Sequence, residues 1–423
     1  MTLPAEATGL PPGPPTSTIA ASVHFKRDPV GLLDRCREEF GDRFTLPLLP
    51  HGKCVILGDP ADVRLVFARS SDEVRAGEAN GFFAPVTGER SMFLLDGPDH
   101  LEARRRVLPA FRGSRTRAQA AVIARLTAEA VDGWPRHTPF RTLEALQALT
   151  LDVLLSVVLG VDDAMAHEEL VAAVKDLLKT ANPPGGALTR DAADVRLRTE
   201  ALVREELARR RRERPEGEDV VAMLLFSEEP EQDTVGILLT LLVAGYETSA
   251  TTLSWALERL ARHPDDMARV TAEATGGAEG DAAEIDAVVH ETLRVRPIVP
   301  LVGRRLHAPL ELTGGLVLPA GVTVAPSVWL VNTREATYPD ARAFRPQRFL
   351  GTVPDTYAWL PFGGGVRRCL GATFALMEMR VMLREIARRV IPRPARVGDE
   401  PIVAHSLSLV PGDGGLVIFE DAR

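Results

Sequence analysis

One cysteine, Cys369, stands where its sulfur could ligate a metal. A helical pattern begins at the next residue, so the sulfur is expected near a helix N-terminus, where partial positive charge favours a thiolate. Arg367 and Arg368 should lower the pKa of the thiol further. The glycines at 363–365 would let a flat ligand lie against the backbone. An axial ligand to a metal macrocycle has these features, but a buried structural cysteine, an oxidation-sensitive nucleophile and a phosphate loop remain alternatives.

A second reactive group lies in a helix predicted over 235–262, which would span about 40 Å. Gly245 costs this helix about 1 kcal/mol relative to alanine, so either a ligand or another helix should pass close to it. Thr248 lies on the same face as Ala244, four residues earlier. The neighbouring acid and hydroxyl of Glu247 and Thr248 could pass protons between solvent and an oxygen species bound at a metal.

Two charged pairs have spacings that allow more than one interpretation. Glu291 and Arg294 share a helix face at i,i+3, as a surface ion pair would. His100 and Arg104 share a face at i,i+4, and a solvated basic face would have the same pattern. Neither pair indicates a function by itself.

The composition is that of a globular protein with a large core. The 423 residues are 45% hydrophobic and 26% charged, which excludes a disordered chain or a fibre. The net charge of −8 argues against a nucleic-acid surface. Three cysteines without CxxC spacing indicate a reducing compartment. We see no signal peptide, and no apolar run approaches the roughly 20 residues of a membrane span, so we expect a cytoplasmic protein without a membrane anchor.

The chain is predicted to be mainly α with small β-sheets. Residues 1–17 form a proline-rich arm, and 18–423 form one large domain. Short strands are expected over 44–49, 53–57, 310–312, 316–318 and 322–324, and a long loop over 77–97. Helices are predicted over 28–40, 61–69, 98–110, 116–131, 141–160, 163–180, 191–213, 218–227, 235–262, 264–275, 281–295 and 370–390.

Residues 362–371 match every fixed position of F-x-x-G-x-R-x-C-x-G, and this segment resembles the haem-binding loop of the cytochrome P-450 superfamily. Residues 244–249 resemble the family's oxygen-activation motif A/G-G-x-D/E-T-T/S. Glu291 and Arg294 resemble its E-x-x-R, and residues 346–349 its P-x-R-F. His100 and Arg104 resemble its H-x-x-x-R.

The resemblance implies the cytochrome P-450 fold, with a long central helix over haem b (iron protoporphyrin IX). Cys369 would be the iron ligand, Thr248 and Glu247 the catalytic pair, and Glu291, Arg294 and Arg348 a buried triad that fixes the haem-loop scaffold. The implied cofactor-binding residues are His100, Arg104, Ala244, Gly245, Arg304, Phe362, Gly363, Arg367, Cys369 and Gly371, with Arg305 leaving the register of Arg304 open. The expected pocket residues are Phe82, Phe83, Met92, Phe93, Leu241, Ala244, Ile298, Val299, Leu301, Val302, Ser406 and Leu407.

The implied activity is that of a haem-thiolate monooxygenase. It would use O2 and two electrons from a ferredoxin or flavodoxin with its NAD(P)H reductase to hydroxylate or epoxidise a small hydrophobic substrate of terpenoid, steroid, fatty acid or polyketide type, as in secondary metabolism. A monomer is expected. A basic docking patch for the electron donor could comprise Arg112, Arg115, Arg117, Arg367 and Arg368, although a merely solvated face would look the same. A peroxide-driven or rearranging haem-thiolate enzyme and a non-catalytic haem sensor or carrier remain alternatives.

Overall fold

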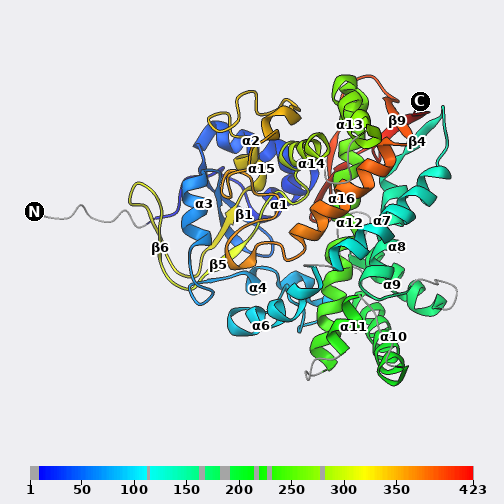
Figure 1. The fold of residues 1–423 in the computed structure, drawn as a ribbon. Coiled ribbons are helices and arrows are strands. Elements are labelled where there is room, and N and C mark those ends of the chain that lie inside the picture. The colour runs from blue at the N-terminus through cyan, green and yellow to red at the C-terminus, as the bar shows by residue number, and fades with distance from the viewer. Residues whose placement is uncertain are drawn as a thin grey trace, which may run out of the picture.

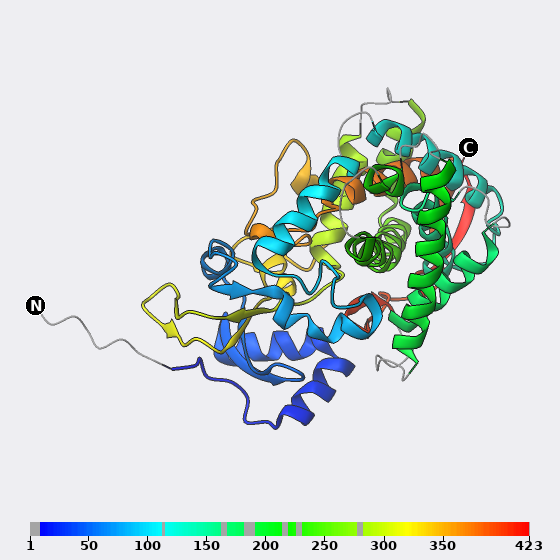
Figure 2. The same cartoon turned by 90° about the horizontal axis from the view of Figure 1, so that it is seen from below.

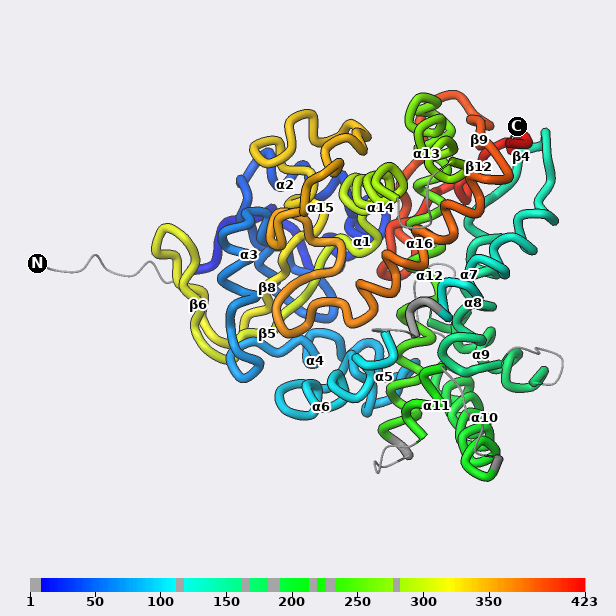
Figure 3. Tube along the Cα trace, viewed as in Figure 1, coloured from blue at the N-terminus to red at the C-terminus, as the bar shows by residue number. Residues whose placement is uncertain are grey.

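The computed structural model describes residues 9–111, 115–161, 167–181, 191–213, 219–225, 231–276 and 282–422. A strand-containing region that also holds the N-terminal helices lies beside a larger helical region (Figure 1). The tube in Figure 3 shows the chain returning to the helical region with α16 and β9 near the C-terminus.

Helices dominate the described chain, and most coincide with predicted segments. They are α1 (Thr18–Arg27), α2 (Pro29–Phe40), α3 (Pro60–Phe67), α4 (Ala76–Ala79), α5 (Ala84–Thr87), α6 (Gly97–Val107), α7 (Arg115–Asp132), α8 (Thr142–Val157), α9 (Glu168–Ala181), α10 (Ala192–Glu213), α11 (Val220–Leu225), α12 (Glu231–Arg262), α13 (Pro264–Gly276), α14 (Ala283–Val295), α15 (Val328–Asn332) and α16 (Ala372–Ala387). Short 3-10 helices are η1 (Gly81–Phe83), η2 (Leu108–Phe111), η3 (Pro346–Phe349) and η4 (Gly365–Arg367).

The largest sheet has five strands in the order β1 (Arg43–Leu48), β2 (Gly52–Leu57), β8 (Thr323–Pro326), β5 (Arg304–Leu306) and β3 (Val74–Arg75). Its β2–β8 pair is parallel and the other pairs are antiparallel. A three-stranded sheet contains β4 (Pro139–Arg141), β12 (Leu416–Asp421) and β9 (Val390–Pro394). Two hairpins pair β6 (Leu310–Glu311) with β7 (Val317–Leu318), and β10 (Ile402–His405) with β11 (Ser408–Pro411).

The short strand predicted over 44–49 is confirmed as β1. In β1, Phe44, Leu46 and Leu48 are buried and the intervening residues are half-buried, as expected for a strand with one face on a core. The part of the arm that is described is extended, and Pro12 accepts a hydrogen bond from the Thr45 backbone at 2.9 Å. The proline-rich segment therefore packs along β1.

Helix α12 runs through the middle of the helical region, where Figure 2 shows it almost end-on with other helices around it. Its 32 residues span about 48 Å. Within it, residues Asp233–Arg262 are long and apolar enough to cross a bilayer by length and composition, but 72% of the most apolar window is buried inside the protein. This burial is what a core helix requires.

Helices α1 and α15 were not predicted, and one prediction about local structure is wrong. The stretch expected as a loop over 77–97 contains α4, η1 and α5. The Asp96 carboxylate explains part of this order, since it accepts hydrogen bonds from the backbone N–H groups of Ala76 and Gly77, each at 3.0 Å. That contact joins residues about 20 positions apart, so no local pattern reports it.

Candidate active site

The loop before Cys369 is folded tightly onto α3. The Cys369 N–H donates to the Phe362 carbonyl at 2.9 Å. A Cβ on Gly365, whose φ is +64°, would lie 2.5 Å from the Phe67 carbonyl oxygen, and one on Gly364 would collide with the Phe67 ring. At Gly363, by contrast, a Cβ would meet no atom within 4 Å. Two of the three glycines are therefore needed for packing, and only Gly363 suits the predicted role of leaving an approach open.

The Cys369 side chain retains exposed surface at the start of α16. The sequence predicts a lowered pKa for this thiol, and that prediction is wrong in direction. The Gly371 N–H, Arg104 and Arg368 lower the pKa, but desolvation by the surrounding protein outweighs them and raises it. Helix-terminal and arginine charges therefore do not by themselves make Cys369 a thiolate, and a bound metal cation would have to supply that stabilisation.

Four basic side chains, those of His100, Arg104, Arg304 and Arg367, form a cluster near the Cys369 loop. Burial, followed by the charges of Arg367, Arg104 and Arg304, lowers the pKa of His100 to about 4, with only Asp96 opposing. Arg304 is 8% exposed and its guanidinium stacks on Phe67, 5.5 Å from the ring centroid.

Burial, then Arg367, lowers the pKa of Arg304 to about 10. Among the described residues, no carboxylate lies within ion-pair distance of Arg304. This cluster has an excess of positive charge that an anionic ligand would compensate.

Arg367 also fastens the segment with the predicted pocket aromatics to the cysteine loop. Its guanidinium donates to the carbonyl of Met92 at 2.9 Å, to the Leu95 carbonyl and to the Asp96 carboxylate at 2.5 Å. All three partners precede α6, which carries His100. Three of the five N–H donors of Arg367 are thus used within the protein.

In α12, Gly245 is explained by helix packing. A Cβ there would lie 2.8 Å from Cδ2 of Leu154 on α8, which supports the helix-packing alternative and leaves the cofactor contact of Gly245 as a proposal. The Thr248 hydroxyl donates to the Ala244 carbonyl at 3.0 Å, as threonines inside helices often do.

Glu247 is buried and turned toward the β10–β11 hairpin. His405 Nδ1 lies 2.9 Å from its Oε1, and the Ser408 hydroxyl donates to its Oε2 at 3.0 Å. Neither His405 nor Ser408 was predicted as a site residue, although they flank the predicted Ser406 and Leu407. No periodicity could reveal them, because they lie 158 and 161 residues from Glu247.

Ser249, next to Thr248, makes a second buried contact that sequence reasoning missed. Its hydroxyl donates to Glu378 Oε2 at 2.5 Å and so ties α12 to α16. Burial raises the pKa of Glu378 to about 7 against the opposing effect of this hydrogen bond. The sequence signal that could have identified Glu378 was an acid inside an apolar helix, nine residues after Cys369.

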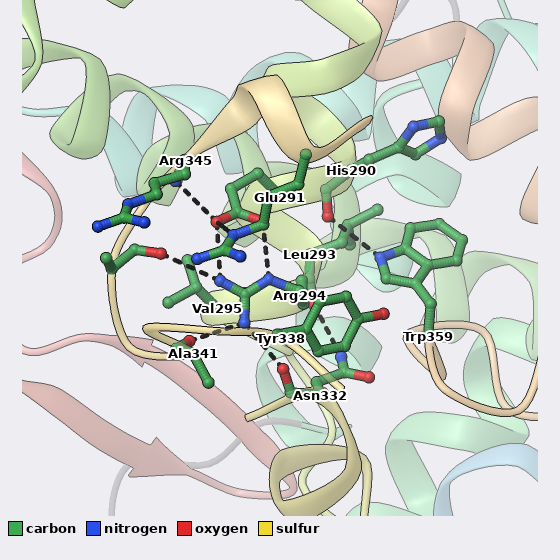
Figure 4. A network of polar contacts seen from close by, with 12 residues as sticks. His290, Glu291, Leu293, Arg294, Val295, Asn332, Tyr338, Ala341, Arg345 and Trp359 are labelled. Atoms are coloured by element: carbon green, nitrogen blue, oxygen red, sulfur yellow. Dashed lines mark hydrogen bonds and ion pairs between the residues drawn. The ribbon is translucent and has the colours of Figure 1, made fainter. Parts of the chain in front are cut away.

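Glu291 and Arg294 are fully buried and form a bidentate ion pair, with both N–O distances 2.7 Å (Figure 4). Arg294 also donates to the carbonyls of Asn332 and Ala341 at 2.8 and 2.7 Å. Arg348 joins less closely, with Nε 3.5 Å from Glu291 Oε1. The interpretation as a surface ion pair is therefore wrong, because both side chains are buried and are contacted by three segments that are distant in the sequence.

The predicted pocket residues lie in four groups: the aromatic segment over 82–93, Leu241 and Ala244 on α12, residues 298–302, and the hairpin turn at 406–407. Phe82, Phe83 and Phe93 lie in series: the Phe82 and Phe83 rings are tilted by 37° with centroids 4.6 Å apart, and the Phe83 and Phe93 rings are stacked with centroids 4.7 Å apart. Met92 and Ile298 are buried, and Leu241, Ala244, Val299, Leu301, Val302 and Ser406 are half-buried, whereas Leu407 is 42% exposed.

The segment over 298–302 and the β10–β11 hairpin are joined, since the Leu409 N–H of the hairpin donates to the Ile298 carbonyl at 2.7 Å. Of the predicted docking patch, Arg112 and the side chains of Arg115 and Arg117 lie outside the described residues.

Comparison with known proteins agrees with this geometry. The family described as cytochrome P-450 matches residues 11–411. A Mycobacterium tuberculosis protein provisionally described as cytochrome P-450 135B1 is 39% identical, covering 98% of this chain and 92% of its own. A second, provisionally described as cytochrome P-450 137, is 36% identical and covers 99% and 93%.

Solved structures share the fold. The retinoic acid-bound cyanobacterial CYP120A1 superposes with a TM-score of 0.84 at 21% identity, over 98% of this chain and 100% of that one. The haem domain of cytochrome P-450DA gives 0.81 at 20% identity, with 98% of each chain covered. The chain belongs to the cytochrome P-450 family, whose members are haem-dependent monooxygenases. The expected fold class, cofactor and enzyme class are thereby confirmed.

The residues present suit a haem. A thiol that retains exposed surface at a helix N-terminus offers one soft axial ligand. Arg304 is a buried guanidinium with no carboxylate within ion-pair distance among the described residues, and it lies beside His100, which is neutral near pH 7. A guanidinium and an imidazole suit a group with two carboxylates. Both features are in the same part of the molecule, since Arg104 Nη1 donates to the Arg368 carbonyl at 2.7 Å beside Cys369.

Proposed function

We propose that residues 18–423 act as one haem-thiolate domain that inserts one oxygen atom of O2 into a small hydrophobic substrate of terpenoid, steroid, fatty acid or polyketide type. The observation that carries the proposal is the position of Cys369 at the start of α16. Its backbone N–H donates to the Phe362 carbonyl, and its loop lies beside the basic side chains of His100, Arg104 and Arg304. The net reaction consumes substrate, O2, two electrons and two protons, and forms hydroxylated product and water.

The haem, when bound, supplies the binding and activation of O2 and accepts the electrons one at a time. Cys369 would hold the iron through its sulfur. His100, Arg104 and Arg304 would hold the propionates, for which charge-assisted contacts are well suited. Arg367 would act through the loop that it fastens, because its donors already bind Met92, Leu95 and Asp96. The other cofactor contacts would come from Ala244, Gly245, Phe362, Gly363 and Gly371.

Thr248 and Glu247 would move the two protons that the reaction consumes. The Thr248 hydroxyl donates to the helix carbonyl of Ala244 and can rotate to serve another acceptor. Glu247 is the adjacent acid, held by His405 and Ser408. The Glu291, Arg294 and Arg348 cluster would act only by fixing the scaffold below the cysteine loop.

The aromatic stack of Phe82, Phe83 and Phe93 would cover the substrate and exclude water, and its fixation through Arg367 would couple the cover to the cysteine loop. Apolar lining of this kind favours an apolar substrate. We infer a ferredoxin or flavodoxin with its NAD(P)H reductase as electron donor, approaching the exposed Arg368, and a monomeric protein of the cytoplasm.

The proposal is tested by the carbon monoxide difference spectrum of the reduced protein. The thiolate-ligated band should be present in the wild type and absent in Cys369→Ala, while Cys54→Ala, a buried cysteine in β2, should retain it. A colourless protein, or a band that survives Cys369→Ala, contradicts it. Reductant-dependent product formation from a library of hydrophobic compounds separates an enzyme from a haem carrier, and peroxide-driven turnover unaffected by Thr248→Ala would favour the peroxide alternative.

A further inference from the structure

The turn between β10 and β11 is held at its base by a single carboxylate. His405 and Ser408 are directly paired across the hairpin and flank the two-residue turn of Ser406 and Leu407. Both contact Glu247, one at each carboxylate oxygen, at 2.9 and 3.0 Å. Ser406 has a φ of +55°, which is strained for a residue with a side chain. Glu247, the acid of the proposed proton path, is therefore bonded directly to the base of the turn that carries the proposed pocket residues Ser406 and Leu407.

The two partners of this ion pair differ in their access to solvent. The Glu247 side chain is 4% exposed, whereas that of His405 is 32% exposed. A buried carboxylate is costly unless a charge or several donors compensate it. When His405 loses its proton, Glu247 loses its counter-charge and keeps only neutral donors, the Ser408 hydroxyl and the Nδ1–H of the neutral imidazole in the tautomer that has it. The ion pair is therefore strong only while His405 is protonated.

The hydrogen bond with Glu247 raises the pKa of His405, and burial opposes it. Helix α1, which carries His24, Lys26 and Arg27, also packs against β10. On α12, Tyr246 precedes Glu247. Among the described residues, only Glu247 acts electrostatically on the His405 pKa. The protonation of His405 thus reports on this one contact.

We propose that His405 is a positioning residue for Glu247, and that its protonation decides whether the carboxylate stays bound to the base of the hairpin turn or is released to serve Thr248. This inference rests on the proposed function, because it gives Glu247 a part in proton transfer. Proton transfer is slow while protonated His405 holds the carboxylate, and faster once His405 is neutral.

The first measurement follows His405 by NMR in haem-loaded protein labelled with ¹³C at histidine Cε1. His405 is the one resonance of the nine histidines that His405→Gln removes. Its pKa should lie above the ordinary value of about 6.5 in the wild type and return to about that value in Glu247→Gln. Ser408→Ala is the matched control, since it removes the neutral donor to the same carboxylate and should leave the His405 pKa raised.

The second measurement is the pH dependence of NADPH-driven hydrogen peroxide release, with a surrogate plant-type ferredoxin, its reductase and no added substrate. O2, two electrons from NADPH and two protons form the peroxide. The wild-type rate should rise by up to about tenfold as the pH increases through the His405 pKa, because a charge-assisted hydrogen bond to Glu247 is replaced by a weaker neutral one. Ser408→Ala should keep this inflection and His405→Gln should lack it.

A His405 pKa that is not raised, a pKa unaffected by Glu247→Gln, or an inflection that persists in His405→Gln would each overturn the inference. His405→Asn replaces His405→Gln if the longer amide lowers the melting temperature. Loss of the carbon monoxide band in the wild type would instead count against the proposed function. An intact band with an unchanged pH profile counts against His405 alone.

Discussion

Replacing Glu291 by glutamine tests whether the buried ion pair supports the fold around the cysteine loop. Both side chains of the Glu291–Arg294 pair are 0% exposed. The carboxylate accepts two bonds from Arg294 and one from the Arg345 backbone N–H at 2.7 Å. An amide would present its NH2 group to a guanidinium that only donates, and Arg294 would keep its carbonyl partners but lose its counter-charge.

Removing one partner of a buried pair costs about 3–5 kcal/mol. The unfolding entropy of 423 residues is about 0.9 kcal/mol/K, from about 2.1 cal/mol/K per residue. The expected loss of melting temperature is therefore about 3–6 °C. Solvent screening does not reduce this cost, since neither group contacts water.

The assay is denaturant and thermal unfolding of the haem-loaded protein, followed by circular dichroism and by the Cys369-dependent carbon monoxide band. The control is Glu129→Gln, which breaks a surface ion pair with Arg125. The Glu129 side chain is 60% exposed and that of Arg125 is 56% exposed. That change should cost below about 0.5 kcal/mol. If Glu291→Gln is no more destabilising than Glu129→Gln, the reasoning from burial fails.

Three further predictions follow from buried groups and close contacts. Because burial raises the pKa of Glu378 to about 7, stability should decrease as the pH rises from about 4.3 to about 7, and Glu378→Gln should remove that dependence in urea titrations. Gly245→Ala gains about 1 kcal/mol of helix propensity, but its Cβ would contact Leu154, so the substitution should be more favourable in a Leu154→Ala background, and an additive double mutant would contradict this. Gly365→Ala should reduce haem retention on gel filtration, since its Cβ would lie 2.5 Å from the Phe67 carbonyl; equal retention refutes it.

Much of the helical framework could be predicted from local patterns. The apolar periodicity of α12 and α14 depends on neighbours a few positions apart, and those predictions are confirmed. The short helices between 76 and 87 could not be predicted, because their order depends in part on the distant Asp96. The pKa direction of Cys369 also failed, since burial is a property of the whole fold and outweighs the adjacent charges.

The sequence alone indicated haem-thiolate chemistry, because the ten residues ending at Gly371 and the motif around Thr248 are short-range patterns that can be identified without a structure. Only the tertiary structure decided what each neighbouring group touches. In the folded chain Gly245 packs against Leu154, Glu291 and Arg294 are fully buried, and Glu247 contacts His405, which lies 158 residues away in the sequence. Desolvation and long-range pairing depend on how the whole chain packs, and local spacing carries no record of either.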